Sequence, residues 1–267
     1  MSCPGDYIVN DGIKLPILLT CPHGGVNSLP SGGPRQNNVN VHCSGVGGET
    51  FEVRPDLCTK KLTRSIANNI LNLYGKHPYI QIAEISRKYV DFNRDIACAY
   101  DHLNEQAKTA YESYHKKILL KIQEMLSQNE NGLAFLFDIH GTGRKTVQDS
   151  NGKNQYVEVI IGTEKGSTIF PLNQKDPVAW WGKTTGLIPL LLDKGVAVWP
   201  PNQTEEMANN APLDGGYTIE TYSSKFSERL VTIQVEVIRC LREPIYTREK
   251  FAADLAECIY SFVKPFI

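Results

Sequence analysis

The sequence has no long apolar run and no leader-like beginning. Nowhere in its 267 residues do apolar side chains approach the about 20 consecutive positions that a membrane-spanning helix needs. The N-terminal segment "MSCPGDYIVNDGIK" lacks the basic stretch followed by an apolar stretch that marks a secretory signal. We therefore expect a cytoplasmic protein that has no contact with a membrane.

An excess of charge is also missing. The chain has 28 basic and 29 acidic residues, which gives a formal net charge of -1. Lysine and arginine are scattered along the sequence, without the basic patch that binds nucleic acid or an anionic lipid surface. We therefore expect a small-molecule partner and no nucleic acid.

Paired cysteines are absent as well. The seven cysteines are odd in number and widely spaced, and none forms a CxxC pair. This pattern argues against a disulfide framework and against a zinc knuckle, so we expect mostly buried thiols. A cysteine hydrolase stays open as an alternative, with Cys21 as nucleophile beside His23 or His140, although no nucleophile elbow surrounds Cys21.

Predicted strands and helices alternate along the chain. Apolar runs predict strands at 13–22, 79–85, 133–139, 156–162, 196–199 and 229–238, and helical spacing predicts helices at 56–75, 104–128, 176–194 and 247–264. Such alternation is typical of an α/β fold whose mixed, mostly parallel sheet has helices on both faces. The length suits a single domain over residues 1–267, with long loops at 26–54 and 200–216.

Two predicted strands end in histidine followed by glycine. In "LLTCPHGG" the strand stops at Pro22, and His23 precedes two glycines, which would let a ligand approach the backbone closely. In "FLFDIHGTGR", Asp138 and His140 are two residues apart, so they project from one face of their strand. Imidazole is a common metal ligand and a neighbouring carboxylate often orients it, so we expect a shared metal site.

The last predicted strand contains a carboxylate inside a β-branched run. In "LVTIQVEVI" the valines and isoleucines share one face, while Gln234 and Glu236 share the other. Glu236 is expected either to form a salt bridge to a helix on that face or to act as a general base beside the metal.

The segment "SRKYVDFNR" follows a strand and contains two arginines. The guanidinium groups of Arg87 and Arg94 can bind a substrate carboxylate through two parallel hydrogen bonds, or stabilise an oxyanion. Polar loops of this kind are often merely solvated, so the interpretation depends on the neighbouring motifs.

Taken together, these motifs resemble the N-formylglutamate amidohydrolase family, whose fold is related to the zinc carboxypeptidases. The resemblance implies a three-layer α/β sandwich and covers about residues 15–240. The matching blocks, in family order, are "PHGG" (22–25), "DLCTKKL" (56–62), "SRKYVDFNR" (86–94), "YH" (114–115), "DIHG" (138–141), "GGYTIETY" (215–222) and "IQVE" (233–236).

The resemblance implies a role for each matched residue. His23 and His140 would be ligands of Zn²⁺, and Glu236 would activate the attacking water. Arg87, Arg94 and Asn93 would hold the substrate's carboxylate and carbonyl oxygen. A loop of Gly215, Gly216 and Tyr217 would cover the substrate, with Tyr222 as a further donor. His115 matches the "YH" block, but a histidine on a helix face more often packs or supports a ligand from behind than binds the metal itself.

The third metal ligand is open at this stage. The carboxypeptidase pattern has Glu three residues after the first histidine, where this chain has Val26. Asp56, at the start of its helix, matches the family's acidic residue, and Glu52 and Glu49 are alternatives.

We therefore expect a zinc-dependent hydrolase that cleaves the amide bond of an N-formyl or N-acyl amino acid, such as N-formylglutamate, with a free carboxylate. A zinc carboxypeptidase or a γ-polyglutamate hydrolase would use the same metal and base. A non-catalytic binding protein on the same fold is the remaining alternative, and it predicts an incomplete set of metal ligands.

Overall fold

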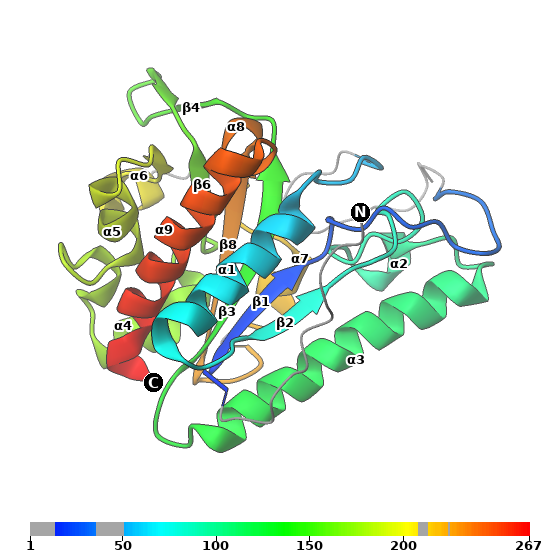
Figure 1. Cartoon of the computed structure of the whole chain (residues 1–267), viewed down its shortest axis with the longest axis horizontal. Coiled ribbons are helices and arrows are strands. Elements are labelled where there is room, and N and C mark those ends of the chain that lie inside the picture. Colours follow the sequence, from blue (N-terminus) through cyan, green and yellow to red (C-terminus); the bar gives the residue numbers. More distant parts are fainter. Residues whose placement is uncertain (1–13, 36–50, 208–212, 224) are drawn as a thin grey trace.

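A computed structural model describes residues 14–35, 51–207, 213–223 and 225–267 (Figure 1). Its centre is a six-stranded sheet in the order β2-β1-β3-β8-β6-β7. Neighbouring strands are parallel except at the pair β6 and β8, so the predicted mixed, mostly parallel sheet is confirmed. The strands are β1 Ile17–Cys21, β2 Tyr79–Ile82, β3 Ala134–Thr142, β6 Val159–Gly162, β7 Val198–Trp199 and β8 Leu230–Ile238.

Alternate side chains of the central strands enter two separate cores. In β3, Phe135 and Phe137 lie in the core against helices α1 Thr59–Tyr74 and α9 Ile245–Val263. Leu136 lies in the other core, against helix α3 Glu105–Gln128. Figure 1 shows α1 and α9 side by side over one face and α3 on the opposite side. The expected three layers are therefore present, because both faces of the sheet are apolar and each requires a cover.

The predicted helix at 176–194 is wrong over its first half. Only α5, Leu187–Asp193, is α-helical there, preceded by a short 3-10 turn at Ala179–Trp181. Gly182 and Gly186 interrupt the helical pattern between them, and a Cβ at Gly186 would meet the carbonyl oxygen of Trp180 at 2.4 Å. The apolar spacing therefore continues through a turn that only glycine permits.

Short elements complete the fold, and one of them falls in a segment predicted as a loop. The segment 200–216 contains a short helix, and the described part of 26–54 contains no helix. The short elements are α2 Ile96–Ala99, β4 Thr146–Gln148, β5 Asn154–Tyr156, α4 Phe170–Lys175, α6 Gln203–Met207, α7 Tyr217–Thr221, α8 Arg239–Arg242, and the 3-10 turns Ser167–Ile169 and Lys264–Phe266.

The cysteines depart in part from the expectation of buried thiols. Cys21 and Cys258 are buried free thiols, whereas Cys58 is partly exposed and Cys240 is exposed. Cys98 is disulfide-bonded, so the expectation of a thiol is wrong at that position. Among the described residues, no helix combines the length and the apolar character needed to cross a membrane.

The sheet register sets the position of the candidate site. Because β1, β3 and β8 are parallel, their carboxyl ends lie at one edge of the sheet. His140 of β3 is directly paired with Glu236 of β8, and His23 follows the end of β1. Three of the predicted chemical side chains therefore meet at this edge.

Candidate active site

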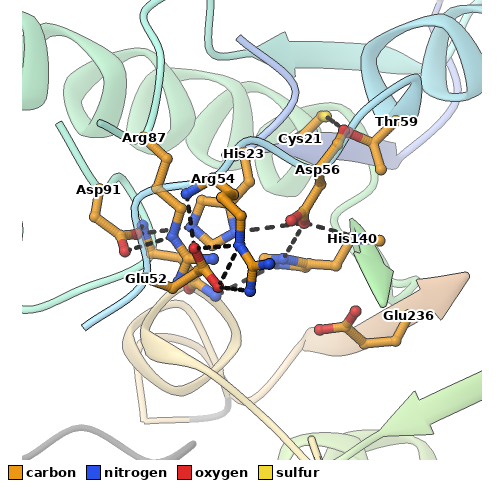
Figure 2. Close-up of polar contacts among 12 residues, drawn as sticks. Cys21, His23, Glu52, Arg54, Asp56, Thr59, Arg87, Asp91, His140 and Glu236 are labelled. Carbon is orange, nitrogen blue, oxygen red and sulfur yellow. Dashed lines mark hydrogen bonds and ion pairs between the residues drawn. The ribbon is translucent and has the colours of Figure 1, made fainter. Parts of the chain in front are cut away.

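His23, Asp56 and His140 converge at the carboxyl edge of the sheet. The Nδ1 atom of His23 is 3.5 Å from Asp56 Oδ2, and Nδ1 of His140 is 3.6 Å from the same oxygen. One ligand atom from each residue lies within 4.8 Å of the others (Figure 2). Two ligands about 2.0–2.1 Å from a tetrahedral zinc are themselves about 3.4 Å apart, so the two distances to Asp56 fit a metal.

Both imidazole rings are oriented by a second carboxylate. His23 places Nε2 2.7 Å from Asp91 Oδ1, and His140 places Nε2 2.8 Å from Asp138 Oδ2. When Nε2–H donates to these carboxylates, each Nδ1 has its lone pair directed towards Asp56. The donor set therefore fits a metal bound through both Nδ1 atoms and one carboxylate oxygen.

The position of Asp56 depends on the backbone around both histidines. Its amide N–H donates to the carbonyl oxygen of His23 at 2.9 Å, and its Oδ2 accepts a 2.9 Å bond from the N–H of Gly141. Burial raises the pKa of this carboxyl, but the two imidazoles outweigh burial and hold it well below its usual range. Asp56 is therefore an anion between two rings.

Asp56 and Asp138 shift the pKa of His140 in turn. Burial alone would lower the pKa of His140, yet Asp138 and Asp56 hold it well above its usual value. Asp138 is fully buried and also accepts a 2.5 Å bond from the hydroxyl of Thr20, which fixes its orientation. A ring with such a polarised environment is a strong electron-pair donor once its Nδ1 is unprotonated.

The glycines beside the histidines serve packing rather than ligand access. A Cβ at Gly24 would meet Cys21 Sγ and the backbone nitrogen of Lys60 at 2.7 Å each. A Cβ at Gly25 would lie 2.4 Å from the carbonyl oxygen of Ile85. The glycines therefore let the start of α1 and the strand-end backbone pack closely around His23, which corrects the interpretation made from the sequence.

The alternatives for the third ligand lie elsewhere. Glu52 is outside the cluster, and its Oε2 pairs with Arg54 Nη2 at 2.7 Å. Hydrogen bonds from Arg54 lower the pKa of Glu52 to about 2. Glu49 lies outside the described residues. Of the acidic candidates that the structure describes, Asp56 is the one beside both histidines.

Glu236 is buried on the β8 strand beside His140. Its exposed fraction is 7 %, and burial raises its pKa to about 7 against the opposing effect of the nearby His140. No described basic side chain forms an ion pair with it within 4.0 Å, so the alternative of a salt bridge to a helix is not observed. A carboxyl of this kind can accept and return a proton near neutral pH.

Arg87 is anchored on the side of His23 that lies away from Glu236 (Figure 2). Its Nε donates to Asp91 Oδ2 at 2.8 Å, so Asp91 contacts both the guanidinium and the imidazole. Arg35, which the sequence left unassigned, donates to Arg87's carbonyl oxygen at 3.0 Å and reaches Asp91 Oδ2 at 3.4 Å. Arg87 and His23, with a smaller contribution from Arg94, hold the pKa of Asp91 well below its usual range, despite complete burial.

Asn93 and Arg94 lie on the same loop and line the cavity. The side-chain oxygen of Asn93 accepts from the N–H of Thr218 at 2.7 Å, and its Nδ2 is 3.3 Å from His140 Nε2. Arg94 donates to the carbonyl oxygen of Asn93 at 3.2 Å and is 4.0 Å from Asp91 Oδ2. Arg94 therefore has donors left for a ligand, since guanidinium carries five N–H groups.

The glycine loop reaches the cavity, whereas Tyr217 and Tyr222 contact His115. Gly215 lines the cavity, and a Cβ at Gly216 would meet Asn93 Nδ2 at 2.6 Å. Tyr217 begins α7 and packs edge-on against His115, with ring centroids 5.6 Å apart. Tyr222 is buried, and its hydroxyl is 2.8 Å from His115 Nδ1 rather than at the cavity.

The thiol of Cys21 is turned away from the histidines. It is fully buried and lies 3.4 Å from the hydroxyl of Thr59 in α1. Burial raises its pKa to about 11, so it is a neutral thiol at physiological pH. This geometry argues against the cysteine-hydrolase alternative.

A cavity of about 550 Å³ opens over the histidines and Glu236. Several of its basic residues could not be predicted from the sequence, because they come from separate turns and share no motif. Among the described residues, the basic side chains that line it are Arg54, Arg87, Arg94, Lys145, Arg239 and Arg242, and the acidic ones are Glu52, Asp56 and Glu236.

Fold and site together define an α/β protein with a His–Asp–His cluster at the carboxyl edge of its sheet. The chain is similar in structure to an N-formylglutamate amidohydrolase from Ralstonia eutropha JMP134, with a TM-score of 0.61, 16% sequence identity and 96% of each chain covered. It is also similar to a gene product from Agrobacterium tumefaciens, with a TM-score of 0.57, 15% identity, and 94% of this chain and 92% of that chain covered.

No protein-family model and no curated protein sequence matches the chain. At these identities the structural likeness establishes the fold, which is the one implied by the sequence resemblance. What the chain does must be argued from its own residues.

Proposed function

We propose that the protein is a zinc-dependent hydrolase that cleaves the amide bond of an N-formyl or N-acyl amino acid with a free carboxylate. The observation that carries the proposal is the pair of Nδ1 atoms facing Asp56, with the buried Glu236 beside them in one cavity. Two imidazoles and one carboxylate form a donor set that is typical of zinc hydrolases. A general base beside the metal is the other part of such a site.

The zinc ion would be held by His23, His140 and Asp56, and when bound it would polarise the amide carbonyl and lower the pKa of water to about 7. Glu236 takes the proton of the attacking water on its carboxylate and returns it to the leaving amine nitrogen. Its burial supports this role, because a base with a pKa near neutrality is effective in both directions.

The arginine loop binds and orients the substrate in this proposal. Arg94 forms paired hydrogen bonds to the substrate's carboxylate, and Arg87 donates to the oxyanion that develops on the carbonyl oxygen. Asn93 and Gly215 line the cavity beside them, Gly216 packs against Asn93, and Tyr217 begins the helix that follows. Tyr222 is not included, because its hydroxyl contacts His115.

A substrate panel tests the proposal. Purified zinc-loaded protein is assayed with N-formyl and N-acyl amino acids, C-terminal dipeptides and γ-linked glutamyl peptides. Release of a free amino acid from the N-acyl compounds is expected. Preference for the peptides would instead indicate a carboxypeptidase or γ-polyglutamate hydrolase, and binding without turnover would indicate a binding protein.

A second experiment tests the assignment of Arg94. Arg94→Lys keeps the charge but loses the paired geometry, so we expect about tenfold weaker substrate binding. Methylating the substrate carboxylate should weaken binding to the wild type and add little further loss in Arg94→Ala. An equal loss in both proteins would place the carboxylate elsewhere. Arg87→Ala is expected to lower mainly kcat.

A further inference from the structure

The cavity has a second basic wall that the proposed reaction does not use. It consists of Lys145, Arg239 and Arg242, which we call the α8 wall, and all three line the cavity. Lys145 follows β3, and the two arginines form the ends of α8 after β8. In the sheet order β2-β1-β3-β8, the loop with Arg87 and Arg94 follows β2, at the opposite end of this row.

The metal-binding residues lie between the two basic walls. Figure 2 shows Arg87 and Asp91 on one side of the histidines and Glu236 of β8 on the other. Arg242 lies on the same side as Glu236, because its Nε donates to the carbonyl oxygen of Val237, the next residue in β8, at 3.0 Å. Its guanidinium also lies against Gly141, where a Cβ would meet Arg242 Nε at 2.6 Å.

Arg242 is a buried cation with weak charge compensation. Its side chain is 4 % exposed and donates to the carbonyl oxygens of Val237 and Leu57. The carboxylate within 4.0 Å of it in the described structure is Glu243, at 3.5 Å, and Glu243 is shared with Arg239 at 3.1 Å. Asp56 also acts on Arg242 from farther away, but Asp56 belongs to the His–Asp–His cluster. One carboxylate therefore serves two arginines, and Lys145 has no ion pair among the described residues. Buried cations are stabilised by anions, so the α8 wall has positive charge available for a ligand.

From this arrangement we infer that the α8 wall binds a second anionic group of the substrate, on its acyl side. The inference rests on the proposed function, in which Arg94 holds the carboxylate of the amino acid part. With that part at Arg94 and the scissile carbonyl at the centre, the acyl group extends towards Arg239, Arg242 and Lys145. The substrate class is thus an N-acyl amino acid whose acyl chain ends in a carboxylate.

A matched pair of compounds tests this inference. N-succinyl and N-succinamoyl derivatives of one amino acid have nearly the same shape, but only the succinyl chain ends in a carboxylate. Wild-type protein is expected to bind the succinyl compound at least about tenfold more tightly, as is typical for hydrogen bonds to a charged group, and the preference should fall with added salt. Affinity is measured by calorimetry and, where turnover occurs, kcat/KM is compared.

Substitutions locate the effect. The double variant Arg239→Gln with Lys145→Gln changes two exposed side chains, so the fold should persist and the preference should fall to about threefold or less. Arg144→Gln is the matched control, because Arg144 is the exposed neighbour of Lys145 and does not line this cavity. Arg242→Gln should also reduce the preference, and its unfolding temperature is measured because Arg242 supports two backbone carbonyls.

The outcomes separate this inference from the proposed function. A succinyl preference that depends on Arg239 and Lys145 but not on Arg144 supports the α8 wall, even if neither compound is hydrolysed. No preference in the wild type, an unchanged preference in the double variant, or an equal reduction in Arg144→Gln would overturn it. Hydrolysis of both compounds at equal efficiency would overturn it while leaving the proposed hydrolysis intact.

Discussion

The two histidines of the site have the same immediate geometry but different supports. His140 lies in β3, and its partner Asp138 is on the same strand and contacts Thr20 of the neighbouring strand. His23 follows its strand, and its partner Asp91 lies in a loop held by Arg87 and Arg35. The first support is a property of sheet register, whereas the second depends on charged side chains far apart in the sequence.

The site therefore has a strand half, made of Asp138, His140 and Glu236, and a loop half, made of His23, Arg35, Arg87 and Asp91. We expect the two halves to respond differently to substitution. In the strand half, each orienting group is fixed by the backbone, so changing one side chain should alter chemistry more than folding. In the loop half, buried charges balance one another, and removing one leaves the others uncompensated. Substitutions in each half test this contrast.

Glu236 belongs to the strand half, and it gives the largest expected change in activity. Glu236→Gln is expected to lower kcat by at least about 10², since the general base is lost while the shape of the side chain is kept. Metal content and unfolding temperature should be close to those of the wild type. Combining Glu236→Gln with Gln234→Glu restores the net charge two residues away on the same face and serves as the control for charge alone. If Glu236→Gln unfolds or loses its metal, Glu236 is a structural residue or a ligand.

The carboxylates behind the histidines compare the two halves directly. Asp138→Asn and Asp91→Asn are each expected to weaken zinc affinity about 10–100-fold, because each replaces the charged carboxylate that accepts from an imidazole Nε2–H with a neutral amide. Asp91→Asn should lower the free energy of unfolding more, by about 3–5 kcal/mol, because Arg87 and Arg35 then lose their carboxylate. Competition with a chelator measures the affinity, and urea unfolding of the metal-free protein measures the stability. Equal stability losses would contradict the contrast.

Arg35 tests the loop half without touching the histidine. Its side chain is 5 % exposed and donates to the carbonyl oxygens of Arg87, Cys98 and Glu52. Arg35→Gln is expected to cost about 1–3 kcal/mol of unfolding free energy and to weaken zinc affinity less than Asp91→Asn does. Arg64→Gln, an exposed arginine of α1 that pairs with Glu84, is the control. A zinc affinity as low as that of Asp91→Asn would show that Arg35, rather than Asp91, orients His23.

Sequence reasoning succeeded where backbone periodicity alone positions a side chain. The alternation of β3 and β8 placed Asp138 with His140 and Gln234 with Glu236 on the correct face, and parallel pairing then brought them together. It failed for Arg35, Asp91 as partner of His23, and Arg242. Their contacts join residues 56 to 185 positions apart, or depend on a loop conformation, and no local pattern encodes them.

His115 lies away from both metal-binding histidines, and its effect on stability is expected only at acid pH. Burial among aromatic rings, with Tyr111 4.3 Å away, lowers the pKa of His115 to about 4 although Asp138 opposes the shift. The unfolded chain takes up this proton below about pH 6.5 and the folded chain only near pH 4, so stability is present above 6.5 and lost between 6.5 and 4. The loss is up to about 3 kcal/mol.

The measurement is urea unfolding of metal-free protein at several pH values. His115→Gln retains an acceptor for Tyr222 and should show a smaller loss of stability over this range than the wild type. The exposed His102 is the control, and His102→Gln should behave as the wild type does. An identical slope in His115→Gln would mean that His115 is not the group responsible.

The metal content of the protein tests the central claim most directly. Protein purified without chelator is analysed for metals, alongside His23→Ala and His140→Ala, and the zinc-loaded wild type is examined by X-ray absorption. We predict one zinc per chain, held by nitrogen and oxygen ligands that include two imidazoles, and loss of zinc in both variants. A full equivalent of zinc retained in either variant, a sulfur ligand, or a wild-type protein that takes up no zinc would contradict the account.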